Sequence, residues 1–376
     1  WYAEAYRARA LLLEELGDLD GALRDLESAL ENADRHGAER VDLARILERR
    51  GRLPAAEGHL RLFLDAPAAA SSTRVAEAEE ALARVERARV DRAVEALRRD
   101  ARNALRRRRA DEAMPLLERI LGLRPDDPWA LFEAGKLHAE RGAVFDAYRA
   151  LRRLVDEQPD DRHAVAAQRE LAALERFRGT AAAGREALEA GRRGLSSGDV
   201  EKAVAELRTA VRRAPFLVDA HLGLAEALLA RGLESGLRVD LVAARDGASD
   251  ALLLAPDFAA ALVVRARAGL ALDDAGAALR DAEAAAAALP DPTDVLILAG
   301  RALLELGRLD EAYDRMQEAF ERRRTAEPVY WQALILQRRG ARREALHRMD
   351  YLYDELGGAP EHLREECEAL YLRLRD

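Results

Sequence analysis

The side chains best able to ligate a metal or to act in nucleophilic catalysis are seven histidines and a single cysteine. The zinc-protease pattern HExxH does not occur, and we expect the histidines to lie at the surface or at the edge of the core. Cys367 has no second cysteine with which to form a disulfide or a zinc site, and we expect a buried thiol. Serines are rare, and we expect no Gly-x-Ser-x-Gly pattern of a nucleophile elbow. No strand is predicted, and so no glycine-rich phosphate loop that follows a strand is expected. The sequence therefore predicts no enzyme active site, no metal and no cofactor.

Two acidic pairs, Asp126-Asp127 and Asp160-Asp161, are the carboxylates that most resemble metal ligands in isolation. Each pair directly follows a proline that ends one amphipathic segment, and each precedes the next segment. An aspartate in this place accepts hydrogen bonds from the free backbone N–H groups of the first helical turn. We therefore predict that both pairs are helix N-caps.

The frame that positions these side chains is a repeated helical hairpin. In residues 129–161, apolar residues recur three and four apart in two segments that join at Gly142 and end at Pro159, which predicts two amphipathic helices. An alanine five residues after the hairpin turn recurs along the chain, and five of the eight intervals between successive alanines are 33 or 34 residues long. These alanines are Ala22, Ala56, Ala113, Ala147, Ala203, Ala244, Ala278, Ala312 and Ala345.

A glycine and a proline mark the ends of the two helices. The glycine, five residues before the alanine, suits a left-handed helix cap. The proline, twelve residues after the alanine, cannot donate the next backbone hydrogen bond. Arg108 and Asp273 replace the glycine in two hairpins. The glycines are Gly17, Gly51, Gly142, Gly198, Gly307 and Gly340, and the prolines are Pro125, Pro159, Pro215, Pro256 and Pro290.

The spacing of these small residues resembles that of the tetratricopeptide repeat, which has a period of 34 residues. The resemblance implies an all-α, right-handed superhelical solenoid of about nine hairpins, with two extra spacer helices and a C-terminal capping helix. The aromatic residue that the family has in the first helix is replaced here by smaller residues, among them Gly194 and Gly269. We therefore expect the helices to pack more closely at these positions.

Three insertions interrupt the repeat period. Two are long enough for one extra helix each, and residues 74–108 are expected to form one unbroken helix of roughly 50 Å. The extra helices serve either as spacers that preserve the stack or as a ridge for dimerisation or docking. The expected segments are 1–70 with two repeats, 71–93 with an extra helix, 94–161 with two repeats, 162–183 with an extra helix, 184–359 with five repeats and an insertion near 233–241, and 360–376 as the capping helix.

One position of the repeat is strongly basic. Eleven residues before the recurring alanine, six of nine positions hold Arg or Lys, whereas an even spread of the 60 basic residues over 376 positions predicts about 1.4. The resemblance implies that this position faces the concave groove and contacts peptide ligands, and arginine can bind a carboxylate with two parallel hydrogen bonds. The basic residues are Arg45, Arg102, Lys136, Arg192, Arg267 and Arg301, and the apolar groove candidates are Trp129, Phe132, Leu188, Leu222, Val263 and Ile297.

The alternative is a solvated ladder of charges that neighbouring acids such as Glu48, Glu95 and Asp294 neutralise. The Lys and Asn pair of the family's carboxylate clamp is not reproduced, so affinity for chaperone tails does not carry over to this chain.

The charge and composition limit the partners. The formal charge of −9 and a basic cluster around Arg106 without interleaved aromatic residues exclude nucleic acid as the expected partner. No apolar run reaches the ~18 residues of a membrane span. We expect a cytoplasmic chain, or a periplasmic or cell-envelope one if a signal segment has been removed.

The expected function is that of a non-catalytic adaptor that binds a partner protein or peptide, possibly acidic, in the concave groove. The alternative is the regulatory or sensor arm of a larger protein, since the chain begins at Trp1 inside a helical pattern. A homo-oligomer formed through the helix at 74–108 is a third expectation.

Overall fold

The computed structural model describes residues 2–31, 37–65, 72–174 and 181–375, and in these ranges it contains twenty α-helices and one short 3-10 helix. Consecutive helices pack as hairpins, as expected for the predicted solenoid. Two compact units are present: the N-terminal unit comprises residues up to Gly142 and residues 150–167, and the C-terminal unit comprises residues 143–149 and residues from Gln168 onward.

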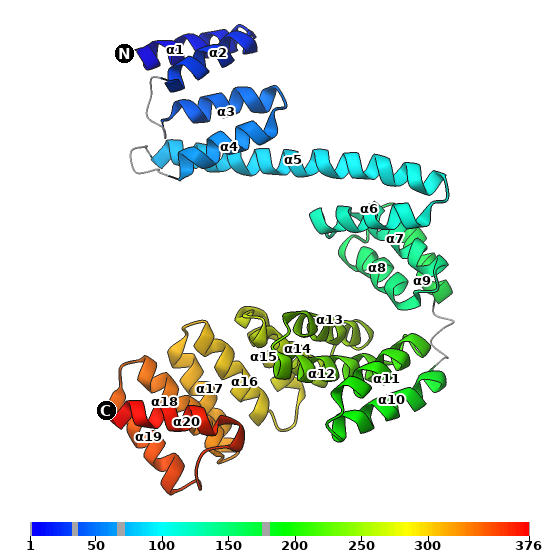
Figure 1. Cartoon of the computed structure of the whole chain (residues 1–376), viewed down its shortest axis with the longest axis vertical. Coiled ribbons are helices and arrows are strands. Elements are labelled where there is room, and N and C mark those ends of the chain that lie inside the picture. Colours follow the sequence, from blue (N-terminus) through cyan, green and yellow to red (C-terminus); the bar gives the residue numbers. More distant parts are fainter. Residues whose placement is uncertain (1, 32–36, 66–71, 175–180, 376) are drawn as a thin grey trace. The chain divides into compact units, whose positions relative to one another are not determined.

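The N-terminal unit contains three successive hairpins and the helix that follows them (Figure 1). Two further helices, α8 (Val144–Glu157) and α9 (Ala164–Leu174), contain residues of both units. The helices of the N-terminal unit are α1 (Tyr2–Glu15), α2 (Leu19–Glu31), α3 (Glu39–Arg49), α4 (Leu53–Leu64), α5 (Ser72–Arg106), α6 (Ala110–Leu123) and α7 (Pro128–Glu140).

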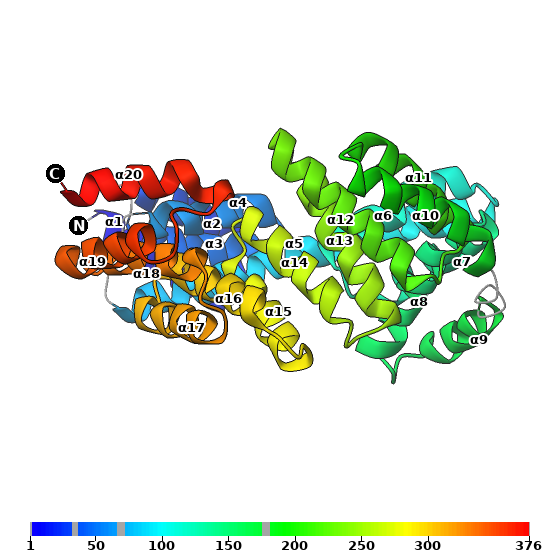
Figure 2. The same ribbon diagram turned by 90° about the horizontal axis from the view of Figure 1, so that it is seen from below.

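The C-terminal unit contains five hairpins and a last helix, α20, which lies along α18 and α19 (Figure 2). The predicted capping helix at 360–376 is therefore present, entered through a 3-10 turn at Glu361–Leu363. The helices of this unit are α10 (Ala181–Ser196), α11 (Val200–Arg213), α12 (Val218–Ser235), α13 (Arg238–Leu254), α14 (Ala259–Ala271), α15 (Ala275–Ala288), α16 (Thr293–Glu305), α17 (Leu309–Arg322), α18 (Ala326–Arg338), α19 (Arg342–Asp354) and α20 (Arg364–Arg375).

The long helix α5 serves two hydrophobic cores in succession. Its first half contributes Ala78 and Val85 to the core that it forms with α1 to α4, and its second half contributes Val94 and Leu97 to the core that it forms with α6 and α7. Figure 1 shows it as one continuous helix, with α4 against its first half and α6 turning back along its second half. This confirms the unbroken helix, which has 35 residues. The sequence also offers Ser71 as an N-cap for this helix, and Ser71 lies outside the described residues.

The repeated small residues occupy the places that the pattern predicts. All nine recurring alanines are buried, with at most 1% of their surface exposed. The six turn glycines have φ between +71° and +83°, in the left-handed region. Arg108 (φ +57°) and Asp273 (φ +65°) adopt the same conformation in the two hairpins without the glycine. Each of the five prolines follows the last residue of a helix by two positions, as at Leu123 and Pro125.

The two helices of a hairpin approach closely where glycine replaces the family's aromatic residue. A Cβ added to Gly194 in α10 would lie 3.0 Å from the backbone nitrogen of Ala203 in α11. A Cβ added to Gly269 in α14 would meet Ala278 at 3.4 Å, which is ordinary van der Waals contact. The expected closer packing is thus tightest at Gly194.

The insertion near 233–241 lengthens both helices around it. Helix α12 has 18 residues and α13 has 17, and a two-residue connection with Gly236 at φ +69° joins them. The sequence pattern alone allows a longer loop or a longer second helix, and the structure shows that the second helix and also the first are extended.

A buried polar cluster joins the first turns of α8 to α12 and α13. The Nε2–H of His221 donates to the carbonyl of Pro215 (2.9 Å), and its Nδ1 lies 4.0 Å from Asp250. Arg149 donates to Asp250 (3.3 Å), and the ring of Phe145 packs at a tilt against His221 with 4.2 Å between centroids. Burial raises the pKa of Asp250 to about 6 and lowers the pKa of His221.

Candidate protein-binding grooves

The predicted basic ladder lies on the first helices of the hairpins: Arg45 on α3, Arg102 on α5, Lys136 on α7, Arg192 on α10, Arg267 on α14 and Arg301 on α16. In the C-terminal unit, the charges of the ladder residues act on side chains of neighbouring hairpins. Burial raises the pKa of Glu226 on α12. The charges of Arg192 and Arg267 both act on this carboxyl in the opposite direction and lower its pKa, but by less. The charge of Arg267 in turn acts on Arg301.

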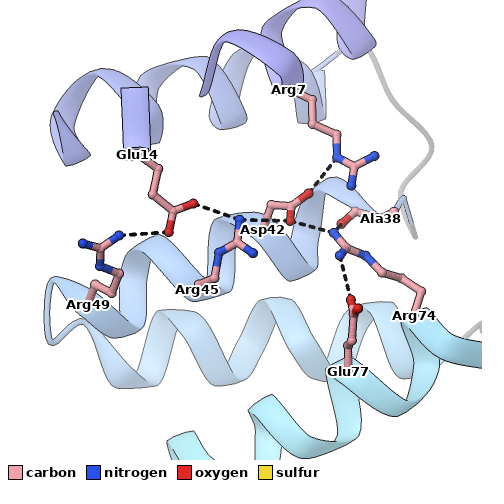
Figure 3. A network of polar contacts seen from close by, with 8 residues as sticks. All are labelled: Arg7, Glu14, Ala38, Asp42, Arg45, Arg49, Arg74 and Glu77. Atoms are coloured by element: carbon pink, nitrogen blue, oxygen red, sulfur yellow. Dashed lines mark hydrogen bonds and ion pairs between the residues drawn. The ribbon is translucent and has the colours of Figure 1, made fainter. Parts of the chain in front are cut away.

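In the N-terminal unit, Arg45 is exposed but belongs to an ionic network with residues of neighbouring helices (Figure 3). It donates to Glu14 of α1 (2.8 Å) and lies 3.4 Å from Asp42. The Asp42 side chain is 2% exposed and also accepts ion pairs from Arg7 and Arg74, each at 2.7 Å. This network ties α1, α3 and α5 together, so Arg45 stabilises the fold.

A second part of the ladder surrounds Trp129. Arg102 lies over the indole ring with its guanidinium carbon 5.2 Å from the centroid, and it is 4.0 Å from Glu95. Lys136 lies 5.4 Å from the ring centroid of Phe132 and pairs with Glu133 at 3.4 Å. A cleft of about 810 Å³ adjoins Arg102 and Trp129. Arg102 and Lys136 therefore each have an acidic neighbour within 4.0 Å.

The ladder residues of the C-terminal unit differ in their partners. Arg192 lies 3.5 Å from both Glu189 and Asp219. Arg267 and Arg301, in contrast, form no ion pair or hydrogen bond within the residues that the structure describes. The guanidinium of Arg301 lies over the indole ring of Trp331 at 5.0 Å, and burial lowers its pKa.

A cleft of about 640 Å³ opens at Arg267, Arg301 and Trp331. Its floor includes Leu270 and Leu298. The acids around it have other partners: Asp273 pairs with Arg238 at 3.3 Å, Asp274 accepts from the backbone of Ala277 at 3.1 Å, and Glu305 lies 3.8 Å from Arg338. Two cations thus face this cleft without an ion pair among the described residues, although the charges of Glu226 and Glu327 act on Arg267 and Arg301 from farther away. We call it the Arg267–Arg301 groove.

Two family models, both described as tetratricopeptide repeat, match this sequence. One matches residues 104–171, and the other matches residues 7–72, 63–128 and 188–235. Together they cover more than half of the chain. The chain belongs to the tetratricopeptide repeat family.

Solved structures similar to this tetratricopeptide repeat protein include three bacterial proteins. Pseudomonas aeruginosa pilF is 20% identical over 52% of this chain and 84% of its own, with a TM-score of 0.43. MamA from Desulfovibrio magneticus RS-1 is 19% identical over 46% of this chain and 93% of its own, with a TM-score of 0.42. A tetratricopeptide repeat protein from Parabacteroides merdae is 12% identical over 75% of this chain and 99% of its own, with a TM-score of 0.38. Among curated proteins, the comparison found no match.

The apolar groove candidates occupy two environments in this tetratricopeptide repeat protein. Leu188, Leu222 and Ile297 are 4–8% exposed and belong to the core of the C-terminal unit, and Trp129 is 9% exposed. Phe132 and Val263 are partly buried. Trp331 is not among the predicted groove residues, because the last repeat is one residue short and the position of Trp331 does not follow from the repeat period. Its place opposite Arg301 comes from the packing of α16 beside α18.

The residues considered for chemistry have structural roles. Asp127 accepts from the backbone of Ala130 at 2.9 Å, which confirms the predicted N-cap, and Asp161 accepts from the backbone of His163 at 2.8 Å. Cys367 is buried as expected, and burial raises the pKa of its thiol to about 11. Within the described ranges, no group of three potential metal ligands comes together. No helix in those ranges is long and apolar enough to span a bilayer.

One motif was missed in the sequence. Residues 194–198 match Gly-x-Ser-x-Gly, but they lie at the end of α10 and in the following turn, and not between a strand and a helix. The hydroxyl of Ser196 donates to the carbonyl of Arg192 at 3.1 Å. The expectation that the chain has no Gly-x-Ser-x-Gly pattern was therefore wrong, although this copy of the pattern is a helix terminus.

Proposed function

We propose that this tetratricopeptide repeat protein is a non-catalytic adaptor whose Arg267–Arg301 groove binds an acidic segment or a C-terminal carboxylate of a partner protein. Proteins of this family generally mediate protein–protein interactions. The observation that supports the proposal is the pair of arginines on neighbouring first helices, neither of which forms an ion pair or a hydrogen bond among the described residues.

The energetics favour an anionic ligand in this groove. Arg301 is partly buried, and burial lowers its pKa. Ligand binding would therefore remove less water from this cation than from a fully exposed arginine, which reduces the desolvation penalty. A carboxylate between the two guanidinium groups would offset their mutual repulsion and accept paired hydrogen bonds. Trp331 and Leu298 offer an apolar wall for a neighbouring side chain of the same ligand.

Reversal of both charges tests this proposal. Affinity purification of the tagged chain from its own cells, read by mass spectrometry, is expected to recover a stoichiometric partner that the variant Arg267→Glu/Arg301→Glu loses. The matched control is Arg213→Glu/Arg324→Glu, which makes the same change in net charge at two exposed residues outside the groove. The control should keep the partner. Equal recovery with all three proteins would remove the groove from the function.

A further inference from the structure

The C-terminal unit has a second cleft, which is formed by the second helices of its last two hairpins. It lies between α17 and α19 and has a volume of about 720 Å³. The Arg267–Arg301 groove is built largely on the first helices α14, α16 and α18. The two clefts therefore use different faces of the layer of hairpins, and the proposed function makes no use of the second one. We call it the α17–α19 cleft.

The walls of the α17–α19 cleft are aromatic. Tyr313 and Phe320 stand seven residues apart on one face of α17, and Tyr351 faces them from α19. Phe320 and Tyr351 pack edge to face, with 6.1 Å between centroids. All three side chains are partly exposed, although the chain has only 7 phenylalanines and 8 tyrosines. Partly exposed aromatic residues on rigid helices are typical anchors of protein interfaces.

The rim of the cleft carries positive charge. Arg348 donates to the Tyr313 hydroxyl at 2.9 Å, a neutral partner that leaves the charge of the guanidinium uncompensated. Arg343 is exposed and forms no ion pair or hydrogen bond with the part of the chain that the structure describes. Glu344 is the one acidic residue among those that line the cleft. In a chain with a formal charge of −9, this is a local excess of positive charge beside an apolar floor at Leu336.

We propose that the α17–α19 cleft binds an acidic segment of a second protein, with one aromatic or aliphatic side chain packed against the exposed surfaces of Phe320 and Tyr351. The carboxylates of that segment would then lie against Arg343 and Arg348. The lining residues of α19 extend from Arg343 to Tyr351, about 12 Å along the helix axis, which suits a segment of a few residues. The site is separate from the Arg267–Arg301 groove, so this chain would hold two acidic partners at once.

A short series of labelled peptides tests the chemistry of the ligand. The full chain is titrated into fluorescein-labelled Glu-Glu-Phe-Glu-Glu, and anisotropy is the readout. We expect binding, with a Kd at least roughly fivefold higher for Glu-Glu-Ala-Glu-Glu, which lacks the anchor, and for Lys-Lys-Phe-Lys-Lys, which reverses the charge. If the phenylalanine peptide does not bind, or if the alanine peptide binds equally well, the proposal is overturned.

Variants of the chain locate the site. Arg343→Glu changes an exposed side chain, so the variant should retain the helical circular dichroism spectrum. Its Kd for Glu-Glu-Phe-Glu-Glu should nevertheless be roughly fivefold higher than that of the wild type. Arg364→Glu, an equally exposed arginine that does not line the cleft, is the matched control and should bind like the wild type. Arg267→Glu/Arg301→Glu should also bind like the wild type. A loss in that double variant without a loss in Arg343→Glu would place the peptide in the other groove and overturn the proposal.

A second copy of the chain is the competing occupant. Light scattering of the wild type and of Arg343→Glu at two concentrations is expected to give the same mass for both. A wild-type dimer that Arg343→Glu dissociates would make the cleft a self-interface and would overturn the proposal of an acidic partner.

Discussion

Arg108 and Asp273 occupy a backbone conformation that their side chains disfavour. Six other hairpin turns place glycine there, and all eight residues have positive φ. For a residue with a Cβ the left-handed conformation costs ~1–2 kcal/mol. The turn geometry is thus set by the packing of the two helices against each other, and the residue at the turn adapts to it.

Substitution of Arg108 by glycine should therefore stabilise the protein. We expect Arg108→Gly to raise the free energy of unfolding by up to about 1 kcal/mol, because relief of strain exceeds the entropy that glycine adds to the unfolded chain. Arg107→Gly, one residue earlier and without positive φ, should lower it. Thermal unfolding followed by circular dichroism measures both, and a lower midpoint for Arg108→Gly would contradict the strain argument.

Asp250 should make stability depend on pH. Its pKa is about 6 in the folded protein and 3.8 in the unfolded reference, so between pH 4 and 6 the folded state binds more protons than the unfolded state. Stability from this group is therefore present at low pH and is lost as pH rises through 6, by about 3 kcal/mol. Relative to Asp250→Asn, the wild type should become less stable between pH 4 and 7.

Unfolding midpoints at several pH values measure this difference. His221 makes the opposite contribution to the pH dependence of stability, because burial lowers its pKa. Both proteins retain His221, so its contribution is present on both sides of the comparison with Asp250→Asn. Asp257→Asn, which removes an exposed carboxyl that does not act on Asp250, is the control and should keep the pH profile of the wild type. Parallel pH profiles for the wild type and Asp250→Asn would refute the expectation.

At the scale of the elements, the distance between the two helices of a hairpin is set by the residues at one crossing point. A buried alanine on the second helix is common to the eight hairpins that lie within one unit, whereas the facing residue on the first helix varies, and glycine at 194 permits a close approach. Side-chain volume at this point decides how far apart the two helices lie.

Gly194→Ala and Gly269→Ala form a matched test of this spacing. Both remove a glycine from a helix interior, which by itself stabilises a helix by about 1 kcal/mol. At Gly194 the new Cβ would lie 3.0 Å from backbone atoms that cannot rotate away, so we expect a net loss of about 1–3 kcal/mol. Gly269→Ala, with 3.4 Å to its nearest neighbour, should be neutral or stabilising. Equal unfolding midpoints would show that the helices separate freely.

How far the sequence predicts this molecule depends on the range of the interactions. The helix ends, the turn glycines and the buried alanines depend on neighbours within one repeat, and they could be predicted. The partners of the ladder residues depend on side chains from adjacent repeats. Arg45 and Arg267 occupy the same repeat position. Arg45 forms ion pairs with Glu14 and Asp42, whereas Arg267 forms none among the described residues. The aromatic walls of the α17–α19 cleft join two repeats, and no periodic signal marks them.

The predicted dimer through the helix at 74–108 stays a prediction. The buried apolar residues of α5 belong to the two cores of the N-terminal unit. A second copy would therefore have to bind the charged face of this helix, which is consistent with a weak, salt-dependent association.

At the scale of the whole molecule, each unit has its own cores and its own clefts. The net charge is negative, yet the candidate binding sites of the C-terminal unit are locally positive. Binding at either site should consequently weaken as salt screens the charges, and the acidic remainder of the surface should repel acidic partners elsewhere.

Helix α5 also has a consequence for how the N-terminal unit folds. In most repeat arrays each hairpin ends at a turn, and such a boundary is a place where the array can open locally while the rest stays intact. Here the boundary between the two cores falls inside an unbroken helix, so fraying on one side would cost helical hydrogen bonds that also order the other side. The repeats before and after α5 are thereby joined into one cooperative folding unit.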